Sequence, residues 1–460
     1  MTGSSVLRGS FRDPAGFVFR REGVLYRQVN EVHRGHFDAL ISSGLYEELL
    51  TEALLIPHEL VDVEPEAPGA HVVIRPEPVA FISYPYEWCF SQLRDAAIAT
   101  LEIQSRALSH GMSLRDATAY NVQFHRGRPT LIDTLSFEVL VEDRPWVAYR
   151  QFCQHFLAPL ALMAHRDVRL GQLLRVHLDG IPLDLASELL PKRARMHPSL
   201  ALHLSMHAKS QRKHASDEEP VSSRRGGFSL RAFRGLLDNL RSGIEKLPDP
   251  GGDSTWRDYY REASHYSAEA ADRKQALVAS AIERVAPATV WDLGANTGRF
   301  SRLASGRGID TVSFDLDPFA VEDNERQRKA EGDTHLLPLV SDLTNPSPAI
   351  GWANEERMTL EQRGPADLVL ALALVHHLAI SNNTPLPLVA DLFARLGRRA
   401  LVEWVPKHDD KVKVLLRDRE DIFDDYTQEG FERAFAGRFE IGSRDVIDPT
   451  DRVMYLLRSR

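Results

Sequence analysis

The spacing of hydrophobic residues changes along the chain, and the C-terminal part has the clearest pattern. Short apolar runs occur there at 289–294, 311–317, 336–343, 367–374 and 399–406, with helical patterns between them. Strands of a parallel sheet are buried on both faces and therefore read as apolar runs, with helices connecting them. The alternation predicts an α/β domain with a doubly wound, Rossmann-like sheet.

The N-terminal part has a different order of elements. Residues 16–29 and 71–84 have the pattern of paired strands, whereas 36–56, 91–110 and 145–176 have helical spacing. Strands and helices that are largely segregated along the chain are typical of an α+β domain. We therefore expect a domain of another class before the parallel sheet.

A polar segment separates the two parts. Residues 205–228 are rich in Ser, Lys, Arg and Glu and contain almost no apolar side chains. Such a segment buries too little surface to offset the entropy lost on ordering, so it is predicted to be a flexible linker. The expected domains are therefore 1–204 and 229–460.

The composition narrows the class of protein. The chain has 460 residues, of which 43% are hydrophobic and 26% charged, as in ordinary globular proteins. Cys89 and Cys153 are the only cysteines, which excludes a disulfide scaffold and a zinc-ribbon cluster, and no metal site is expected. A net charge of −9 argues against a nucleic-acid partner. The longest apolar runs are shorter than the roughly 20 residues that cross a bilayer, so we expect a cytoplasmic protein without a membrane partner.

The most informative motif lies at the end of the first apolar run. The predicted strand ends at Leu293, a turn with Gly294 and Gly298 follows, and a helix then begins. Glycines permit a sharp turn and a close approach to a ligand, and a helix N-terminus offers free N–H groups. A dinucleotide-binding loop requires Gly-x-Gly-x-x-Gly, but its second and third glycine positions are Asn296 and Arg299. The loop is therefore a poor match to that motif.

This spacing instead resembles motif I of the class I S-adenosylmethionine-dependent methyltransferases. The resemblance covers Asp292, Gly294, Asn296 and Gly298, with Asn in place of a middle glycine. It implies that these four residues, together with Ala295, bind S-adenosylmethionine.

Two acids at the ends of the next strands extend the resemblance. Asp315 lies 21 residues after Gly294, and the family places there an acid that accepts hydrogen bonds from the ribose hydroxyls. Asp317 is a second candidate for this role. Asp342, after the third strand, is implied to meet the adenine amino group.

The resemblance also places acceptor-side groups after the fourth and fifth strands. His376 and His377 follow the fourth strand, and Glu403 lies at the end of the fifth. A general base assists methyl transfer to a hydroxyl, an amine or an acidic carbon, and histidine is a base near neutral pH. Simpler roles remain open: the histidines as a helix cap, and Glu403 as the partner of Lys407.

Residues 255–285 resemble the helices that cover the cofactor in this family. Four aromatic residues are candidates to close over the methionine end of the cofactor, or to pack between helices: Trp256, Tyr259, Tyr260 and Tyr266.

The N-terminal part resembles a kinase-like phosphotransferase domain. Asp116 and Asn121, with Asp133 after an apolar strand, have the spacing of the catalytic loop and the metal-binding aspartate. However, the glycine-rich loop is missing, and Arg27 is the cation nearest to the expected lysine. We therefore expect a non-catalytic kinase-like domain, with an unrelated α+β fold as the alternative.

The combination is similar to a group of bacterial class I methyltransferases, some related to nodulation-factor modification. It implies a methyltransferase that acts on a small molecule or a glycan, and it leaves the oligomeric state open. Two alternative functions remain. One is a phosphotransferase that uses Asp116, Asn121 and Asp133, and the other is a cofactor-binding module without turnover.

Overall fold

The computed structural model describes residues 5–205, 229–252, 268–417 and 419–460. The predicted linker, apart from residue 205, lies outside the described residues, as do Trp256, Tyr259, Tyr260 and Tyr266. The chain divides into two compact units. The first comprises Met1–Gly251 and Ile350–Arg357, and the second comprises Gly252–Ala349 and Met358–Arg460.

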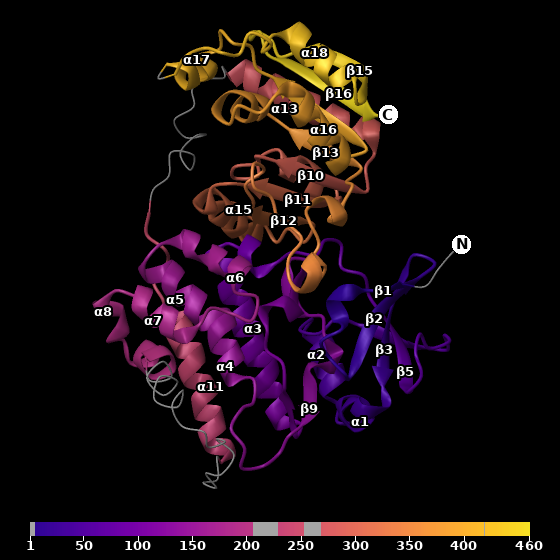
Figure 1. Cartoon of the computed structure of the whole chain (residues 1–460), viewed down its shortest axis with the longest axis vertical. Coiled ribbons are helices and arrows are strands. Elements are labelled where there is room, and N and C mark those ends of the chain that lie inside the picture. The colour runs from indigo at the N-terminus through magenta and orange to yellow at the C-terminus, as the bar shows by residue number, and fades with distance from the viewer. Residues whose placement is uncertain (1–4, 206–228, 253–267, 418) are drawn as a thin grey trace. The chain divides into compact units, whose positions relative to one another are not determined.

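The second unit contains a seven-stranded sheet with the order β12-β11-β10-β13-β14-β16-β15 (Figure 1). Its strands are β10 (Thr289–Leu293), β11 (Asp310–Asp315), β12 (Leu336–Val340), β13 (Leu368–Ala371), β14 (Arg399–Trp404), β15 (Phe439–Val446) and β16 (Val453–Ser459). The first five pair in parallel, whereas β16 is antiparallel to both β14 and β15. The predicted α/β class with a parallel sheet is therefore confirmed, and the antiparallel hairpin at its edge is an addition.

Helices of the second unit connect the parallel strands. They are α13 (Ala268–Val285), α14 (Ser301–Ser305), α15 (Pro318–Glu331), α16 (Leu386–Leu396), α17 (Asp410–Leu416) and α18 (Gln428–Ala436). The start of α15 shows how the sequence fixes these boundaries. Asp317 accepts a hydrogen bond from the backbone N–H of Phe319 at 3.0 Å, and Pro318 occupies the first helical turn. Gly332 then ends the helix in a left-handed conformation.

The strand order reverses beside β10, and this reversal determines where a ligand can enter. From β10 the chain builds outward to β11 and β12, then returns to place β13 on the other side of β10. Loops that leave neighbouring strands in opposite directions open a crevice at the carboxyl ends of the strands. The register aligns Leu293 with Phe314 and Asp315 with Val340, so the loops after β10, β11 and β12 meet at this crevice.

The first unit contains a five-stranded antiparallel sheet with the order β1-β2-β3-β5-β4. Its strands are β1 (Ser5–Val6), β2 (Gly16–Arg21), β3 (Val24–Asn30), β4 (His58–Val61) and β5 (Ala70–Pro76). Two short strand pairs follow: β6 (Met112–Leu114) with β9 (Phe137–Val139), and β7 (Val122–His125) with β8 (Arg128–Leu131). The unit is α+β, as the sequence predicts.

Helices make up the rest of the first unit. They are α1 (Arg34–Ser42), α2 (Leu45–Thr51), α3 (Phe90–Ser109), α4 (Tyr149–Phe152), α5 (Ala158–His165), α6 (Leu173–Val176), α7 (Leu183–Leu189), α8 (Lys192–Arg195), α9 (Pro198–Leu200) and α11 (Leu230–Glu245). The placement of α11 differs from the sequence-based boundary at residue 229. This helix belongs to the first unit because Arg241 pairs with Glu102 of α3 at 2.6 Å and Phe233 packs on Trp146.

Both cysteines of the chain are buried in the first unit, and neither forms a disulfide. Burial raises the pKa of the Cys153 thiol to about 12, so this thiol stays protonated at neutral pH. Among the described helices, none combines the length and the apolar character that crossing a bilayer requires.

Candidate functional site

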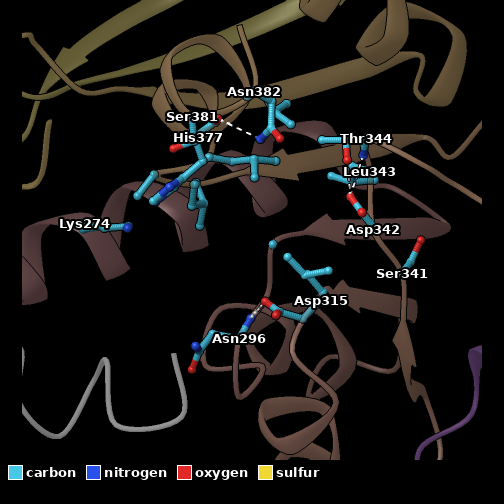
Figure 2. Close-up of a pocket in the computed structure, with 16 residues that line it drawn as sticks. Lys274, Asn296, Asp315, Ser341, Asp342, Leu343, Thr344, His377, Ser381 and Asn382 are labelled. Carbon is cyan, nitrogen blue, oxygen red and sulfur yellow. Dashed lines mark hydrogen bonds between the residues drawn. The ribbon is translucent and has the colours of Figure 1, made fainter. Parts of the chain in front are cut away.

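A cavity of about 290 Å³ lies at the crevice of the second unit (Figure 2). Its walls come from α13, from the loops after β10, β11 and β12, and from the segment that follows β13. Five leucines form its apolar surface: Leu316, Leu343, Leu372, Leu374 and Leu378. A cavity that combines an apolar surface with a few polar groups is typical of a small-molecule site.

The loop after β10 depends on residues with positive φ. Gly294, Asn296 and Gly298 have φ angles of 73°, 51° and 75°. A Cβ at Gly298 would lie only 2.4 Å from the side-chain oxygen of Asn324, so no larger residue fits there without a shift. Gly294 and Asn296 line the cavity, whereas Gly298 does not and instead allows the loop to pack closely on α15.

Two backbone groups of this loop bind the protein itself. The N–H groups of Gly294 and Ala295 both donate to the carbonyl oxygen of Phe314, each at 2.9 Å. Ala295 is buried and is not among the residues that line the cavity. Its position fixes the loop against β11 and thereby positions Asn296.

Asp315 ends β11 and faces the cavity. Its carboxylate accepts hydrogen bonds from the backbone N–H groups of Asn296 at 2.7 Å and Asp317 at 2.9 Å. Burial raises the pKa of this carboxyl to about 6, even though both hydrogen bonds favour the ionised form. Asp317 itself caps α15 and does not line the cavity.

Asp342 lies in the loop after β12 and lines another part of the cavity. It accepts hydrogen bonds from the backbone N–H and the hydroxyl of Thr344, at 2.8 and 2.6 Å. Ser341 and Leu343 line the cavity beside it. The sequence-predicted Asp315 and Asp342 are thus brought to one cavity together with Gly294.

Asp292 lies under the glycine loop rather than in the cavity wall. It is buried, and the hydroxyl of Ser301 donates to it at 2.6 Å. Burial raises the pKa of Asp292 to about 6. The hydrogen bond joins the end of β10 to the start of α14, so Asp292 supports the loop from below.

The histidine pair follows β13, and the two rings differ in position. His377 lines the cavity, whereas His376 is buried behind it with ring centroids 4.1 Å apart. Burial lowers the pKa of His377 to about 4 and that of His376 well below its usual value, so both rings are uncharged at neutral pH. His376 precedes the π-helical turn His377–Ser381 but forms no side-chain capping hydrogen bond.

Glu403 does not line the cavity and is fully buried in an ion-pair network. It contacts Lys274 Nζ at 2.7 Å and Arg452 Nη1 at 3.2 Å. The proposed partner Lys407 pairs instead with Asp421 at 2.8 Å. A carboxylate between two buried cations is held in place by them.

Lys274 is a cavity residue that the motif search missed. It lies on α13 in line with Ala270 and Val278, which are buried at the same four-residue spacing. A lysine within an apolar row of a helix is unusual, and this was the signal in the sequence that could have revealed it. Ser381 and Asn382 also line the cavity and carry no motif of their own.

The three kinase-like residues of the first unit also come together. The charge of Asp133 helps burial to raise the pKa of Asp116, and Asn121 donates to Ser136 at 3.1 Å. Arg27 of β3 forms an ion pair with Asp133 at 2.8 Å. Within the described part of the chain, no three His, Cys, Asp or Glu side chains are grouped so that they could hold a metal ion.

Comparison with known proteins gives a relative over nearly the whole length. No protein-family model matches the chain. The nodulation protein NoeA of Rhizobium meliloti strain 1021 is 35% identical over 456 residues, which cover 97% of this chain and 94% of NoeA. The chain belongs to the NoeA family. Because the match covers both units, the two-unit organisation is shared with NoeA rather than acquired by fusion in this chain alone.

Solved structures give weaker similarities. A putative O-methyltransferase from Nostoc punctiforme is 15% identical, with a TM-score of 0.32 over 44% of this chain and 60% of that one. A TehB-like SAM-dependent methyltransferase from Corynebacterium glutamicum is 18% identical, with a TM-score of 0.27 over 45% of this chain and 94% of that one. The bifunctional kinase-methyltransferase WbdD is 14% identical, with a TM-score of 0.29 over 47% and 45%. Scores of this size do not establish a shared fold.

Proposed function

We propose that the second unit is an S-adenosylmethionine-dependent methyltransferase. The observation that carries this proposal is the meeting of Gly294, Asp315 and Asp342 around one cavity at the reversal of the sheet. Each of these residues was assigned to the cofactor from a separate motif, and the motifs end on three neighbouring strands. A nucleoside fits this arrangement because one carboxylate can accept two ribose hydroxyls while a second can accept an exocyclic amine.

The strand order supports the same proposal. Numbered within the second unit, the order is 3-2-1-4-5-7-6, with the last strand antiparallel. This is the arrangement of the class I methyltransferases that the sequence resembles. A dinucleotide-binding unit is less well supported, since Asn296 occupies the second glycine position and has a positive φ of 51°.

The residues of the cavity suggest how transfer is assisted. S-adenosylmethionine supplies a methyl group bound to a positively charged sulfur. Asp315 holds the ribose, and the leucines around the cavity exclude competing water. His377 is the candidate general base because it lines the cavity and is uncharged at neutral pH, so that it can take up a proton.

The acceptor that we propose is a small molecule or a glycan. His377, Ser381 and Asn382 come from one turn and present polar groups to the cavity. Hydroxyl and amide side chains of this kind recognise neutral hydroxyl-bearing ligands through hydrogen bonds.

We propose that the first unit is kinase-like but does not transfer phosphate. The ion pair between Arg27 and Asp133 supports this view, because a guanidinium already neutralises the carboxylate that would hold magnesium. The alternative phosphotransferase requires this pair to open.

Calorimetric titration of the full chain tests both proposals. S-adenosylmethionine and S-adenosylhomocysteine are expected to bind with micromolar affinity, whereas ATP with magnesium is expected to give no heat. If a folded chain binds neither sulfur compound, the methyltransferase proposal is wrong. Saturable binding of ATP with magnesium would return attention to Asp116, Asn121 and Asp133.

Cofactor binding is expected to release a proton near pH 6. In the unliganded chain the pKa of Asp315 is about 6, and hydrogen bonds from ribose hydroxyls favour its ionised form. The affinity should therefore fall by about tenfold for each pH unit below 6. Titration of S-adenosylhomocysteine at pH 5.5 in two buffers of different ionisation enthalpy measures the released proton.

The effect on the stability of the unliganded chain has the opposite sign. A carboxyl whose pKa is raised on folding stabilises the protein below its unfolded pKa of about 4. For Asp315 and Asp292 this contribution is lost as the pH rises through about 6. A binding enthalpy that is identical in both buffers would contradict the role given to Asp315.

A further inference from the structure

Lys274 differs in charge from the rest of the cavity wall. Among the described residues that line the cavity, it is the basic side chain that is charged at neutral pH, because His377 is neutral there. Asp315 and Asp342 are the two acids of the wall. The cavity therefore offers acidic groups to one part of a ligand and an ammonium group to another.

The positions of these groups follow a line through the cavity. Figure 2 shows Lys274 and Asp342 on opposite sides, with Asp315 between them, and the Lys274 nitrogen points toward the cavity. A ligand whose ribose is held at Asp315 and whose base reaches Asp342 has its remaining portion on the Lys274 side. Asn296 also lines the cavity below this line.

The surroundings of Lys274 hold its ammonium group in place. Nζ lies 2.7 Å from Glu403 and 4.6 Å from the centre of the Phe300 ring. Glu403 is shared with Arg452, which in turn binds Asp409 at 2.8 and 3.1 Å. Because an ammonium group has three donors, Lys274 can bind Glu403 and a ligand oxygen at once.

We infer that Lys274 binds the carboxylate of the aminobutyrate portion of S-adenosylmethionine, at the end of the cavity opposite Asp342. The inference rests on the proposed function, since it presupposes this cofactor. A lysine recognises a carboxylate as a compact positive charge and forms a charge-assisted hydrogen bond to it. Glu403 and Arg452 act here as positioning residues, because they fix the lysine without reaching the cavity.

Two ligands that differ only in this carboxylate provide the test. Decarboxylated S-adenosylmethionine keeps the nucleoside, the sulfonium and the amine. Wild-type chain is expected to bind S-adenosylmethionine about 10–100-fold more tightly than the decarboxylated compound, the range for a hydrogen bond between charged groups. Lys274→Met should remove most of this preference, weakening the first ligand but changing the second by less than about threefold. Lys274→Arg should retain part of it.

Controls separate the possible failures. Lys413→Met removes an exposed lysine outside the cavity and should leave both affinities unchanged. Thermal unfolding checks that Lys274→Met is folded, and the wild-type comparison alone decides the question if it is not. Equal wild-type affinities for both ligands, or equal weakening of both in Lys274→Met, would overturn the inference and leave the methyltransferase proposal standing. If the wild type binds neither ligand, both proposals fall.

Discussion

Glu403→Gln is expected to lower the free energy of unfolding of the second unit by about 3–5 kcal/mol, the usual cost of breaking a buried ion pair from one side. Glu403 is fully buried between Lys274 and Arg452. The substitution leaves two buried cations facing a neutral amide. Urea unfolding followed by circular dichroism and tryptophan fluorescence measures the loss.

A matched variant shows whether burial is the cause. Glu440 pairs with Arg458 on β15 and β16, where both side chains are well exposed. Glu440→Gln should therefore cost no more than about 1 kcal/mol. An unchanged stability in Glu403→Gln, together with lost turnover, would instead support the acceptor-side role that the sequence indicated for Glu403.

Asp315→Asn is expected to weaken S-adenosylhomocysteine binding by at least about 100-fold, because two hydrogen bonds to a charged acceptor are replaced by weaker ones. The fold should tolerate the change. Burial already disfavours the ionised carboxylate, so a neutral amide at this position relieves that cost while one oxygen remains to accept from Asn296 or Asp317. Calorimetry gives the affinity, and thermal unfolding of the unliganded chain confirms that the variant is folded.

The control for Asp315 lies on the same strand. Asp310 begins β11, is half-exposed and pairs with His335. Asp310→Asn changes the charge of the chain by the same amount, but at the opposite end of the strand from the cavity. It should bind S-adenosylhomocysteine like the wild type. Equal affinity of Asp315→Asn and Asp310→Asn would show that Asp315 does not contact the cofactor.

The parallel strands were predictable because a buried strand needs apolar residues on both faces. The hairpin β15 and β16 was not predicted, and the burial of β15 explains why. Only Phe439 is buried in β15, since this strand forms the edge of the sheet and exposes most of its side chains. An edge strand produces no continuous apolar run, and its pairing with a distant segment is not encoded locally.

The site shows the same division between local and long-range information. Gly294, Asp315 and Asp342 were identified because each lies at a strand end within a short motif, and parallel register then brings them together. The partners of Glu403 could not be identified in this way. Lys274 precedes the sheet and Arg452 follows it, so only the folded chain brings them together. Helix α11 was assigned to the wrong side of the boundary for a similar reason, since an amphipathic pattern does not show which surface a helix packs on.

The distribution of cysteines offers a built-in probe of unfolding. Cys89 and Cys153 are both buried in the first unit, and the second unit has no cysteine in its sequence. The rate of alkylation by a thiol reagent therefore reports the opening of the first unit alone. Circular dichroism, in contrast, follows both units, so the two signals together assign a loss of stability to one unit. For Glu403→Gln, the alkylation rate should stay at the wild-type value while the circular dichroism transition moves to lower urea.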